Sequence, residues 1–380
     1  MLRGQGGLTS RDRYKGLKGS LMSAPSVSET HAAYDAAYFQ AYAHVAVHEE
    51  MIKDQVRTET YRAAIEQHQY LIQDKVVLDV GCGTGILSIF CAKAGARKVY
   101  AVDASEIAVQ AREIVKANNL SDKITVIIGK VEEVDIDEEV DVIVSEWMGY
   151  MLLYESMLST VISARDRWLK PGGLILPSHA TLYLAPITHP ERYSDSIDFW
   201  NDVYGIDMSP MLPLAKQCAF EEPLVEVITG ENVLSWPTVV KDINCNTITV
   251  QELELVTAEF SVASMMNAHL HGFALWFDVT FERPSITPSD AQSDSLNDNL
   301  NRRRKRAKSN SLVLSTAPEE EPTHWAQTVL YIYDPIEVRQ DQIIEGSITL
   351  SQNQKNPRFL NIHLEYASGG RKFVKESVLS

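Results

Sequence analysis

Val77-Leu78-Asp79-Val80-Gly81-Cys82-Gly83-Thr84-Gly85 is the stretch that decides the fold, because in it an apolar strand runs into a glycine-rich turn. A helical segment and a second β-rich segment follow, and the latter ends at Asp103, eighteen residues after the turn. This order is typical of a nucleotide-like ligand bound at the carboxyl edge of a parallel sheet. A dinucleotide site has the pattern Gly-x-Gly-x-x-Gly, which would place its third glycine at Ile86. The glycine spacing therefore predicts a smaller adenosyl ligand, S-adenosylmethionine, and not NAD.

Each half of this pattern also has a purely structural interpretation. A glycine-rich turn between a strand and a helix allows tight packing in many α/β folds. Asp103 could cap the helical segment that begins at Ala104-Ser105, although a carboxylate at a strand end can also accept bonds from both ribose hydroxyls. The loop and the carboxylate, at this spacing, together favour adenosyl binding over packing alone.

The composition is that of a soluble globular protein long enough for two domains. The chain has 380 residues, of which 45% are hydrophobic and 23% charged. No run approaches the roughly 18 apolar residues of a membrane span, so we expect no membrane segment. The four cysteines have no paired metal-ligand spacing, so we expect reduced thiols inside a cell and no metal site.

Charge is distributed unevenly along the chain. The net charge is −16, and the run Arg-Arg-Arg-Lys-Arg-Ala-Lys at residues 302–308 holds six cations. The rest of the chain therefore carries −22, which should repel nucleic acid and attract basic ligands such as a basic peptide. The basic run predicts a nuclear location, with a cytoplasmic share left open. A nucleic-acid patch and a solvated linker are the other interpretations of the run.

The N-terminal half predicts a Rossmann-like α/β domain over residues 31–178, after a disordered tail over residues 1–30. The tail has few large apolar residues and several Gly and Ser, whereas residues 33–68 have helical periodicity. Continuous apolar strands, which suit a parallel sheet covered on both faces, then alternate with helices. The strands are expected at 75–80, 97–102, 124–128 and 140–145, and the helices at 85–94 and 105–119.

Beyond the Pro-Gly-Gly of residues 171–173 the pattern changes to strands without crossover helices. These strands predict an antiparallel β-barrel-like substrate domain over residues 179–380, either a barrel or a sandwich. They are expected at 181–185, 247–253, 273–282, 328–333 and 342–350. An aromatic helical stretch over 190–216 predicts a projecting arm, and the Pro-, Ser- and Asn-rich residues 284–321 predict a disordered insertion.

Two carboxylates, Glu146 and Glu155, lie nine residues apart in an otherwise apolar hairpin after the strand that ends near Val144. Ligands bind at this edge of a parallel sheet. Two carboxylates in apolar surroundings repel each other, which raises a pKa unless a cation lies between them. A guanidinium has the planar fork that pairs with carboxylates, so the pair predicts a guanidinium site. Two solvated glutamates at helix ends are the structural alternative.

Five separated motifs resemble the protein arginine N-methyltransferase family, and the resemblance runs from about Tyr38 to the C-terminus. They are Tyr38-Phe39-x-x-Tyr42 with His48-x-x-Met51-x-x-Asp54-x-x-Arg57-Thr58, the loop 77–85, the strand 99–103, the double-glutamate hairpin and Thr323-His324-Trp325. Together, in this order, they are highly specific. The resemblance implies an S-adenosylmethionine-dependent methyltransferase domain followed by a β-barrel domain with a helical dimerisation arm.

The resemblance implies a role for each matching residue. The implied cofactor-binding residues are Phe39 and Tyr42 on a helix that closes over the cofactor, His48 and Arg57 at its methionine end, Gly81, Gly83 and Gly85 at the adenosyl group, Asp103 at the ribose and Glu132 at the adenine. The implied catalytic residues are Glu146 and Glu155, which grip the substrate guanidinium, Met51 and Met157 beside it, and Asp54 paired with His324. Glu132 could instead face water, and both methionines could be core fillers. Asp103 departs from the family, which usually has Glu there. With the shorter side chain, either the loop should approach the ribose more closely or the cofactor should bind more weakly.

The resemblance also implies a product and partners. The product would be ω-N-monomethylarginine and then asymmetric dimethylarginine (type I), because the symmetric enzymes carry Phe in place of Met51. The substrates would be histones or other Arg/Gly-rich nuclear proteins, methylated by a homodimer that binds neither membranes nor nucleic acid directly. Two alternatives remain, a small-molecule methyltransferase and a non-catalytic scaffold. The first would not need the paired glutamates or the barrel, and the second would tolerate a broken hairpin.

Overall fold

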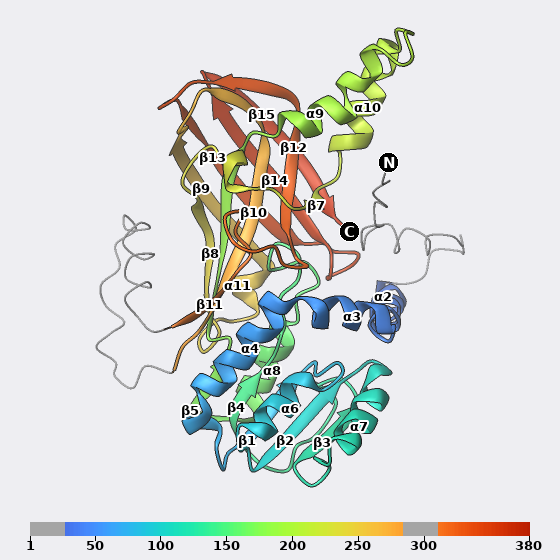
Figure 1. The fold of residues 1–380 in the computed structure, drawn as a ribbon, viewed down its shortest axis with the longest axis vertical. Helices are drawn as coiled ribbons and strands as arrows, with labels where there is room; N and C mark the ends of the chain where they lie inside the picture. Colours follow the sequence, from blue (N-terminus) through green and yellow to red (C-terminus); the bar gives the residue numbers. More distant parts are fainter. Residues whose placement is uncertain (1–26, 284–310) are drawn as a thin grey trace, which may run out of the picture.

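The computed structural model describes residues 27–283 and 311–380. Figure 1 shows a parallel sheet with its helices at one end of the long axis and a taller set of antiparallel strands at the other. The basic run 302–308 lies outside the described residues. Among the helices of the two described ranges, none has the length and apolar content needed to cross a membrane.

The N-terminal residues form a series of helices that lie between the sheet and the barrel (Figure 1). They are α2 (Val27–Tyr42), α3 (Val45–Lys53), α4 (Gln55–Gln67) and α5 (Gln69–Ile72). The predicted helical stretch 33–68 is thus broken, and the break before α4 is at Asp54, whose side chain caps that helix. The predicted disordered tail is wrong at its end. Because residues 27–42 contain no Gly or Pro and are rich in Ala, the helix begins at Val27.

The parallel sheet confirms the predicted α/β class. Its five strands have the order β3-β2-β1-β4-β5, and every neighbouring pair is parallel. The strands are β1 (Val76–Val80), β2 (Lys98–Asp103), β3 (Ile124–Ile128), β4 (Val140–Val144) and β5 (Leu169–Leu176), and the helices are α6 (Ile86–Lys93), α7 (Ile107–Ala117) and α8 (Leu158–Trp168). The strand order reverses at β1, so the loops after β1 and β4 lie at the switch point where such sheets bind ligands.

Two antiparallel sheets form the second part. The larger has the order β7-β12-β10-β6-β8, with β11 paired to β10, and the smaller has the order β15-β14-β13-β9. The strands are β6 (His179–Ile187), β7 (Leu224–Glu226), β8 (Thr238–Asn244), β9 (Leu255–Ala263), β10 (Ala268–Phe281), β11 (Leu312–Ser315), β12 (Gln327–Val338), β13 (Ile343–Gln352), β14 (Leu360–Ser368) and β15 (Arg371–Leu379). Because β8 contacts β9, the two sheets join along one side into a barrel-like shape.

Two sequence predictions in the barrel are wrong. Residues 247–253, predicted as a strand, form a turn and the short helix α11 (Gln251–Glu254). The Glu252 carboxylate accepts bonds from the backbone N–H and the hydroxyl of Thr249, which holds the chain in a turn. The predicted disordered insertion 284–321 extends too far, since β11 lies inside it, pairs with β10 and buries Leu314 in the core.

A helical arm projects from the barrel (Figure 1). It contains α9 (Pro190–Ser196), the 3-10 helices η2 (Asp198–Asn201) and η3 (Ser209–Met211), and α10 (Leu212–Phe220). Phe220 anchors its base, because this ring is fully buried and lies 5.6 Å from the stacked ring of Tyr193 and 5.2 Å from that of Tyr331.

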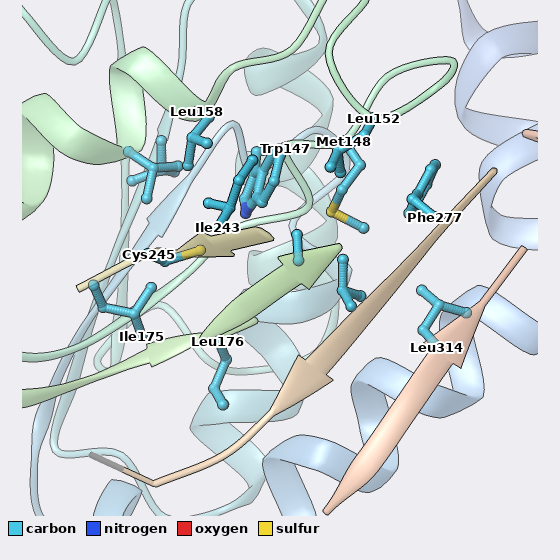
Figure 2. Packing of buried hydrophobic residues seen from close by; sticks show 14 of the residues in the cluster. Trp147, Met148, Leu152, Leu158, Ile175, Leu176, Ile243, Cys245, Phe277 and Leu314 are labelled. Carbon is cyan, nitrogen blue, oxygen red and sulfur yellow. The ribbon is translucent and has the colours of Figure 1, made fainter. Parts of the chain in front are cut away.

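The parallel sheet and the barrel share one hydrophobic core. Trp147 of the hairpin after β4 belongs to the same cluster as Phe277 and Leu314 from the barrel strands (Figure 2). Tyr61 of α4 packs edge-on against Phe281 of β10, with ring centroids 5.0 Å apart. A fully buried large apolar side chain contributes about 1.5–3 kcal/mol, so this core holds the hairpin with its two glutamates firmly between the two parts.

Candidate active site

A cavity of about 840 Å³ lies where the N-terminal helices, the carboxyl edge of the parallel sheet and the barrel meet. Most of the predicted site residues line it: Phe39, Tyr42, His48, Met51, Arg57, Gly81, Gly83, Asp103, Glu132, Glu146, Glu155, Met157 and His324. Gly85 and Asp54 do not line it. Gly85 has a left-handed backbone and is the N-cap of α6. Asp54 accepts a hydrogen bond from His324, which does line the cavity.

The glycine loop after β1 packs closely against two side chains that line the cavity. Gly81 has φ +71°, and a Cβ built on it would lie 2.5 Å from Cε of Met157. A Cβ on Gly83, at φ +53°, would lie 3.2 Å from the ring of His48. Glycine is favoured at both positions, because the backbone is left-handed and the loop packs closely against these two side chains.

Asp103 ties the end of β2 to the glycine loop. One carboxylate oxygen accepts the Gly83 N–H at 2.8 Å, and the other accepts the Ser105 N–H at 2.8 Å and its hydroxyl at 2.6 Å. The capping role considered for Asp103 is wrong, because α7 begins at Ile107 with Glu106 at its N-cap, and the bonds from Asp103 to Ser105 close a turn before that helix. A carboxylate offers about four acceptor positions, so one remains for a ribose hydroxyl at the cavity. The bond to Gly83 has an ordinary length, so the closer approach or weaker binding expected from the shorter Asp side chain stays a prediction.

His48 and Arg57 are buried side chains of α3 and α4, 4% and 5% exposed. His48 Nε2 lies 2.7 Å from the Tyr42 carbonyl oxygen, which ties α3 to the end of α2. Arg57 Nε donates to Glu146 at 3.1 Å, and Nη1 donates to the Met51 carbonyl at 3.0 Å. Its Nη2 makes no hydrogen bond to the described residues, so these N–H groups suit the methionine carboxylate of the cofactor. That contact stays a prediction.

Glu132 and Glu133 both line the cavity and are both exposed. They differ in one respect, because Glu132 accepts a hydrogen bond from the Thr160 hydroxyl at 2.9 Å. Thr160 also lines the cavity, so this bond fixes the Glu132 carboxylate at its wall. The structure therefore favours Glu132 over its neighbour as a ligand-facing group, and its contact with adenine stays a prediction.

The hairpin of residues 145–157 is rigid. Ser145 Oγ donates to the Val80 carbonyl at 2.8 Å, and Tyr61 donates to the Ser145 carbonyl at 3.0 Å. Glu155 itself has φ +54°, an uncommon conformation for a residue with a side chain and one that tends to occur at functional sites. A Cβ on Gly149 would overlap the Tyr154 carbonyl, so only glycine fits there.

The two glutamates of the hairpin face different cations. Glu146 pairs with Arg57, and both side chains are less than a tenth exposed. Burial raises the pKa of Glu155 above its ordinary value, and the charge of Arg358 opposes that rise. The solvated alternative is therefore excluded, since both carboxylates lie in the cavity and each has an arginine of the chain near it.

Asp54 and His324 meet as predicted. The Asp54 carboxylate accepts the His324 backbone N–H at 2.9 Å and contacts its Nδ1 at 2.7 Å, while its other oxygen accepts the Arg57 N–H at 2.9 Å. Burial acts to raise the pKa of Asp54, but these hydrogen bonds hold it below its ordinary value. Asp54 therefore joins the barrel loop to the first turn of α4, which carries Arg57.

Sequence reasoning missed Asp35, Lys130 and Arg358, which also line the cavity. Arg358 pairs with Asp35 at 2.9 Å, and Lys130 pairs with the same carboxylate at 2.7 Å. Helical periodicity could have identified Asp35, since it lies three residues before Tyr38 on the same helix face. Arg358 follows Asn-Pro in a loop, a pattern that indicates only a turn.

The site has the parts that an adenosyl cofactor needs. Carboxylates for hydroxyl groups, a buried guanidinium for a carboxylate and a glycine loop all border one cavity. Within residues 27–283 and 311–380, no group of three or more His, Cys, Asp or Glu side chains is placed to hold a metal ion.

Comparisons with known proteins decide the family. The model of the arginine methyltransferase oligomerization subdomain matches residues 178–295 and 304–371, and that of ribosomal protein L11 methyltransferase matches residues 58–178. A probable protein arginine N-methyltransferase 6 of Arabidopsis thaliana is 65% identical over 376 residues, 96% of this chain and 86% of the relative. The chain belongs to the protein arginine N-methyltransferase family. A protein arginine N-methyltransferase 6 of Danio rerio is 46% identical over 342 residues, 89% of this chain and 91% of the relative.

Solved structures agree with this assignment. The Trypanosoma brucei arginine methyltransferase 1 enzyme-prozyme complex with S-adenosylhomocysteine has a TM-score of 0.77 and 38% identity, covering 90% of this chain and 100% of its own. Arabidopsis thaliana protein arginine methyltransferase 10 has a TM-score of 0.75 and 36% identity over the same shares. The segment 47–52 and the Val-Ser-Glu-Trp of the hairpin resemble the member numbered six, and the relatives of that name confirm this prediction. This arginine methyltransferase uses S-adenosylmethionine as its methyl donor.

Proposed function

We propose that this enzyme is a type I arginine methyltransferase, which forms ω-N-monomethylarginine and then asymmetric dimethylarginine. The supporting observation is that Met51 and Met157 line the same cavity as the paired glutamates. A methionine side chain is flexible, so it can make room for a nitrogen that already carries one methyl group. The same nitrogen can then be presented a second time, which gives two methyl groups on one nitrogen.

The two glutamates prepare the target arginine for attack. S-adenosylmethionine supplies a methyl group on a sulfonium, and in-line transfer needs the nucleophile to be aligned with it. A guanidinium is a poor nucleophile, because it is protonated and its lone pairs are delocalised. Glu146 and Glu155 hold positive charge on two of its nitrogens while the third recovers nucleophilic character. Alignment of this kind can lower a barrier by several kcal/mol, up to about 7–11 in the best models.

Glu155 is the better acceptor for the proton that the target nitrogen loses. Its pKa is raised by burial, so it holds a proton more readily than an ordinary carboxylate. The pKa of Asp54 is instead held down by its hydrogen bonds, so this carboxylate holds a proton less readily than Glu155 does. We therefore assign proton acceptance to Glu155, and to the Asp54–His324 pair the role of holding the barrel loop against α4.

Product analysis tests the proposal. Purified enzyme, incubated with labelled S-adenosylmethionine and a histone or Arg/Gly-rich peptide, should yield monomethylarginine first and asymmetric dimethylarginine later. Mass spectrometric fragmentation separates the two dimethyl isomers. Symmetric dimethylarginine as the main product would contradict the type I assignment. A lack of peptide labelling beside labelled small molecules would favour the small-molecule alternative, and no transfer at all would favour a scaffold.

Histones or other Arg/Gly-rich nuclear proteins are the proposed substrates. The whole chain has a net charge of −16, even with its basic run included. A protein this acidic attracts a basic peptide over long range. Raising the ionic strength should therefore lower the rate of association with such a peptide. An acidic peptide with the same target arginine is the control, and equal rates for both peptides would contradict this substrate class.

A homodimer formed through the arm is the proposed assembly. The tip of the arm exposes Phe199 at 51% and Tyr204 at 100%, an apolar set that an interface would cover. Trp200, between these two residues in the arm, is half-buried. Phe199→Ala with Tyr204→Ala should give a poorly active monomer, and light scattering that shows an unchanged dimer would place the interface elsewhere.

Nuclear import through the basic run 302–308 is the proposed cellular address. Runs of about 5–8 Lys and Arg residues often serve this use, and the run lies outside the motifs of the site, the nearest of which begins at Thr323. Alanine at residues 302–305 should move a fluorescent fusion toward the cytoplasm and leave methylation in vitro intact. A variant that stays in the nucleus would leave the linker or nucleic-acid interpretation.

A further inference from the structure

Asp35 of α2 is held between two cations from different parts of the molecule. Its Oδ2 lies 2.7 Å from Lys130 Nζ, just after β3, and its Oδ1 lies 2.9 Å from Arg358 Nη2 and 3.3 Å from Arg358 Nε. Arg358 comes from the loop before β14, so this carboxylate connects α2 to both the parallel sheet and the barrel. Two donors of the Arg358 fork are thereby occupied.

The same guanidinium packs on the aromatic side chains of α2. Arg358 Cζ lies 3.6 Å from the ring centroid of Tyr38 and 5.5 Å from that of Phe39. Among the described side chains of α2, which begin at residue 33, Tyr38 alone is buried. The position of this helix therefore depends on Arg358 and Asp35 more than on a hydrophobic core.

Arg358 also lies beside the substrate-binding glutamate. Its backbone carbonyl accepts the Glu155 N–H at 3.2 Å, and its charge opposes the rise that burial causes in the pKa of Glu155. A guanidinium is the group that Glu155 binds in the proposed reaction. An arginine of the chain in this place would compete with the target arginine unless its own donors were occupied.

We propose that Arg358 is a positioning residue that makes binding of the target arginine depend on the seating of α2. With α2 in place, Asp35 holds the guanidinium fork and Glu155 is open to the substrate. When Asp35 is lost, the fork turns to Glu155 and acts as an internal competitor. The inference rests on the proposed role of Glu155 as a guanidinium ligand, and it concerns residues that no motif of the site includes.

Three variants test this arrangement through peptide binding. Asp35→Asn removes the charge that holds Arg358 and keeps the size of the side chain. If the released fork occupies Glu155 nine-tenths of the time, the apparent Kd and KM for an Arg/Gly-rich peptide rise about tenfold. Arg358→Ala removes the competitor and should keep peptide affinity near that of the wild type. The double variant Asp35→Asn with Arg358→Ala should behave like Arg358→Ala, so the second substitution rescues the first.

Calorimetric titration of the peptide, with S-adenosylhomocysteine present and at a pH above the acid limb of the rate, measures this directly. A purely structural anchor predicts that both single variants and the double variant bind the peptide equally weakly, and that result would overturn the proposal. Glu59→Gln, an exposed carboxylate on α4, is the control for the loss of one charge from these helices. Thermal unfolding of each variant checks that the fold is kept.

Two further measurements separate this inference from the function on which it rests. Arg358→Gln removes the charge that lowers the pKa of Glu155, so the acid limb of the pH–rate profile should move to higher pH. An unmoved acid limb would contradict the proximity of these two groups in solution. Glu155→Gln should weaken peptide binding whatever Arg358 does, and unchanged binding in that variant would instead remove the guanidinium role of Glu155.

Discussion

The parallel sheet and the barrel differ in how their sequences encode structure. In β1 all five residues are buried, whereas buried residues alternate with more exposed ones along β14. A strand covered on both faces is a continuous apolar run, and a strand with one wet face alternates. The first pattern leaves few alternative folds, because apolar residues dominate these strands; the buried Asp79 of β1 is an exception, and its carboxylate accepts the Ser88 hydroxyl at 2.6 Å. The site residue Asp103 ends β2, and Glu146 lies two residues after the end of β4.

The barrel contributes to the site in a different way. Two of its cavity-lining residues, His324 and Arg358, come from separate loops and reach the N-terminal helices through Asp54 and Asp35. The loops of the parallel sheet thus carry Asp103 and the paired glutamates, which we propose bind the cofactor and the target arginine, and the barrel fixes the helices that cover them. Substitutions of the sheet-side residues should therefore reduce the rate of methyl transfer. Substitutions at the contacts between the barrel and the N-terminal helices should instead change the stability of the fold and the position of those helices.

Glu146→Gln, a substitution on the sheet side, should cause the largest loss in the rate of methyl transfer. Loss of one buried charge against a guanidinium costs about 2–5 kcal/mol, roughly 30-fold to several thousandfold in turnover. Cofactor affinity, measured by calorimetry, should stay close to that of the wild type. Glu133→Gln, a cavity-lining but exposed neighbour of Glu132, is the control and should cost far less. Robust turnover by the Glu146 variant would remove its proposed role.

Asp54→Ala should have the next largest effect, a loss of stability, and tests the contact between the barrel loop and α4. It removes a helix cap worth about 1 kcal/mol and charge-assisted bonds to His324 worth about 1.5–3 kcal/mol. Urea unfolding at neutral pH should show the loss, and Asp54→Asn, which keeps a capping side chain, should lose less. The folded-state pKa of Asp54 is depressed, so its contribution is present above the ordinary value of 3.8 and is lost as pH falls through the folded value. A difference that does not shrink at low pH would contradict the pairing.

Much of the sheet side could be predicted from the sequence, because its determinants are local. The loop 77–85 and Asp103 lie within one strand–helix–strand unit, so their spacing alone predicted an adenosyl site. The sequence also predicted that the two hairpin glutamates act together on one guanidinium. What the sequence could not show is that each would face a different arginine, since Arg57 precedes Glu146 by 89 residues and Arg358 follows in the barrel.

The barrel side was less predictable for the same physical reason. The bond between Arg358 and Asp35 spans 323 residues, and a loop with Asn and Pro predicts a turn without saying what the turn contacts. Residues 247–253 alternate like a strand, yet a side-chain bond from Thr249 to Glu252 makes them a turn. In the larger sheet β6 pairs with β10 and β7 with β12, segments far apart in the sequence, so a local pattern says little about which of them meet.

Comparing Gly81→Ala with Gly172→Ala separates the cost of backbone strain from the effect of a new side-chain atom in the loop that we expect to border the cofactor. Both glycines have left-handed backbones, at φ +71° and +73°, so each substitution should cost about 1–2 kcal/mol of stability. Only at Gly81 would the new Cβ meet a neighbour, Cε of Met157 at 2.5 Å, because nothing lies within 4 Å at Gly172. The Gly81 variant should therefore bind S-adenosylmethionine more weakly in calorimetry, while the Gly172 variant should not. Equal affinity in both would mean that the loop does not border the ligand.

Lys375→Met should have the smallest effect at neutral pH and tests how the barrel holds the arm. Lys375 Nζ donates to the Phe220 carbonyl at 2.6 Å, at the end of α10, and the residue is only 7% exposed. Burial lowers the pKa of Lys375 from 10.5 to about 8, although the charge of Glu221 acts in the opposite direction.

The sign of the pH dependence follows from proton binding in the two states. Between pH 8 and 10.5 the folded state has released a proton that the unfolded state still binds, so stability rises with pH across this range. Below pH 8 both states carry the proton, and the cost of burial is constant. Replacing the charge by an apolar side chain of similar length is then close to neutral, because the lost bond and the removed burial cost offset each other. The stability difference between wild type and variant, measured by urea unfolding, should therefore be small at pH 7 and favour the wild type increasingly toward pH 10. Lys372→Met, at an exposed position on the same strand, should leave that difference flat, and a flat difference for Lys375→Met as well would show that the ammonium is not buried against the arm.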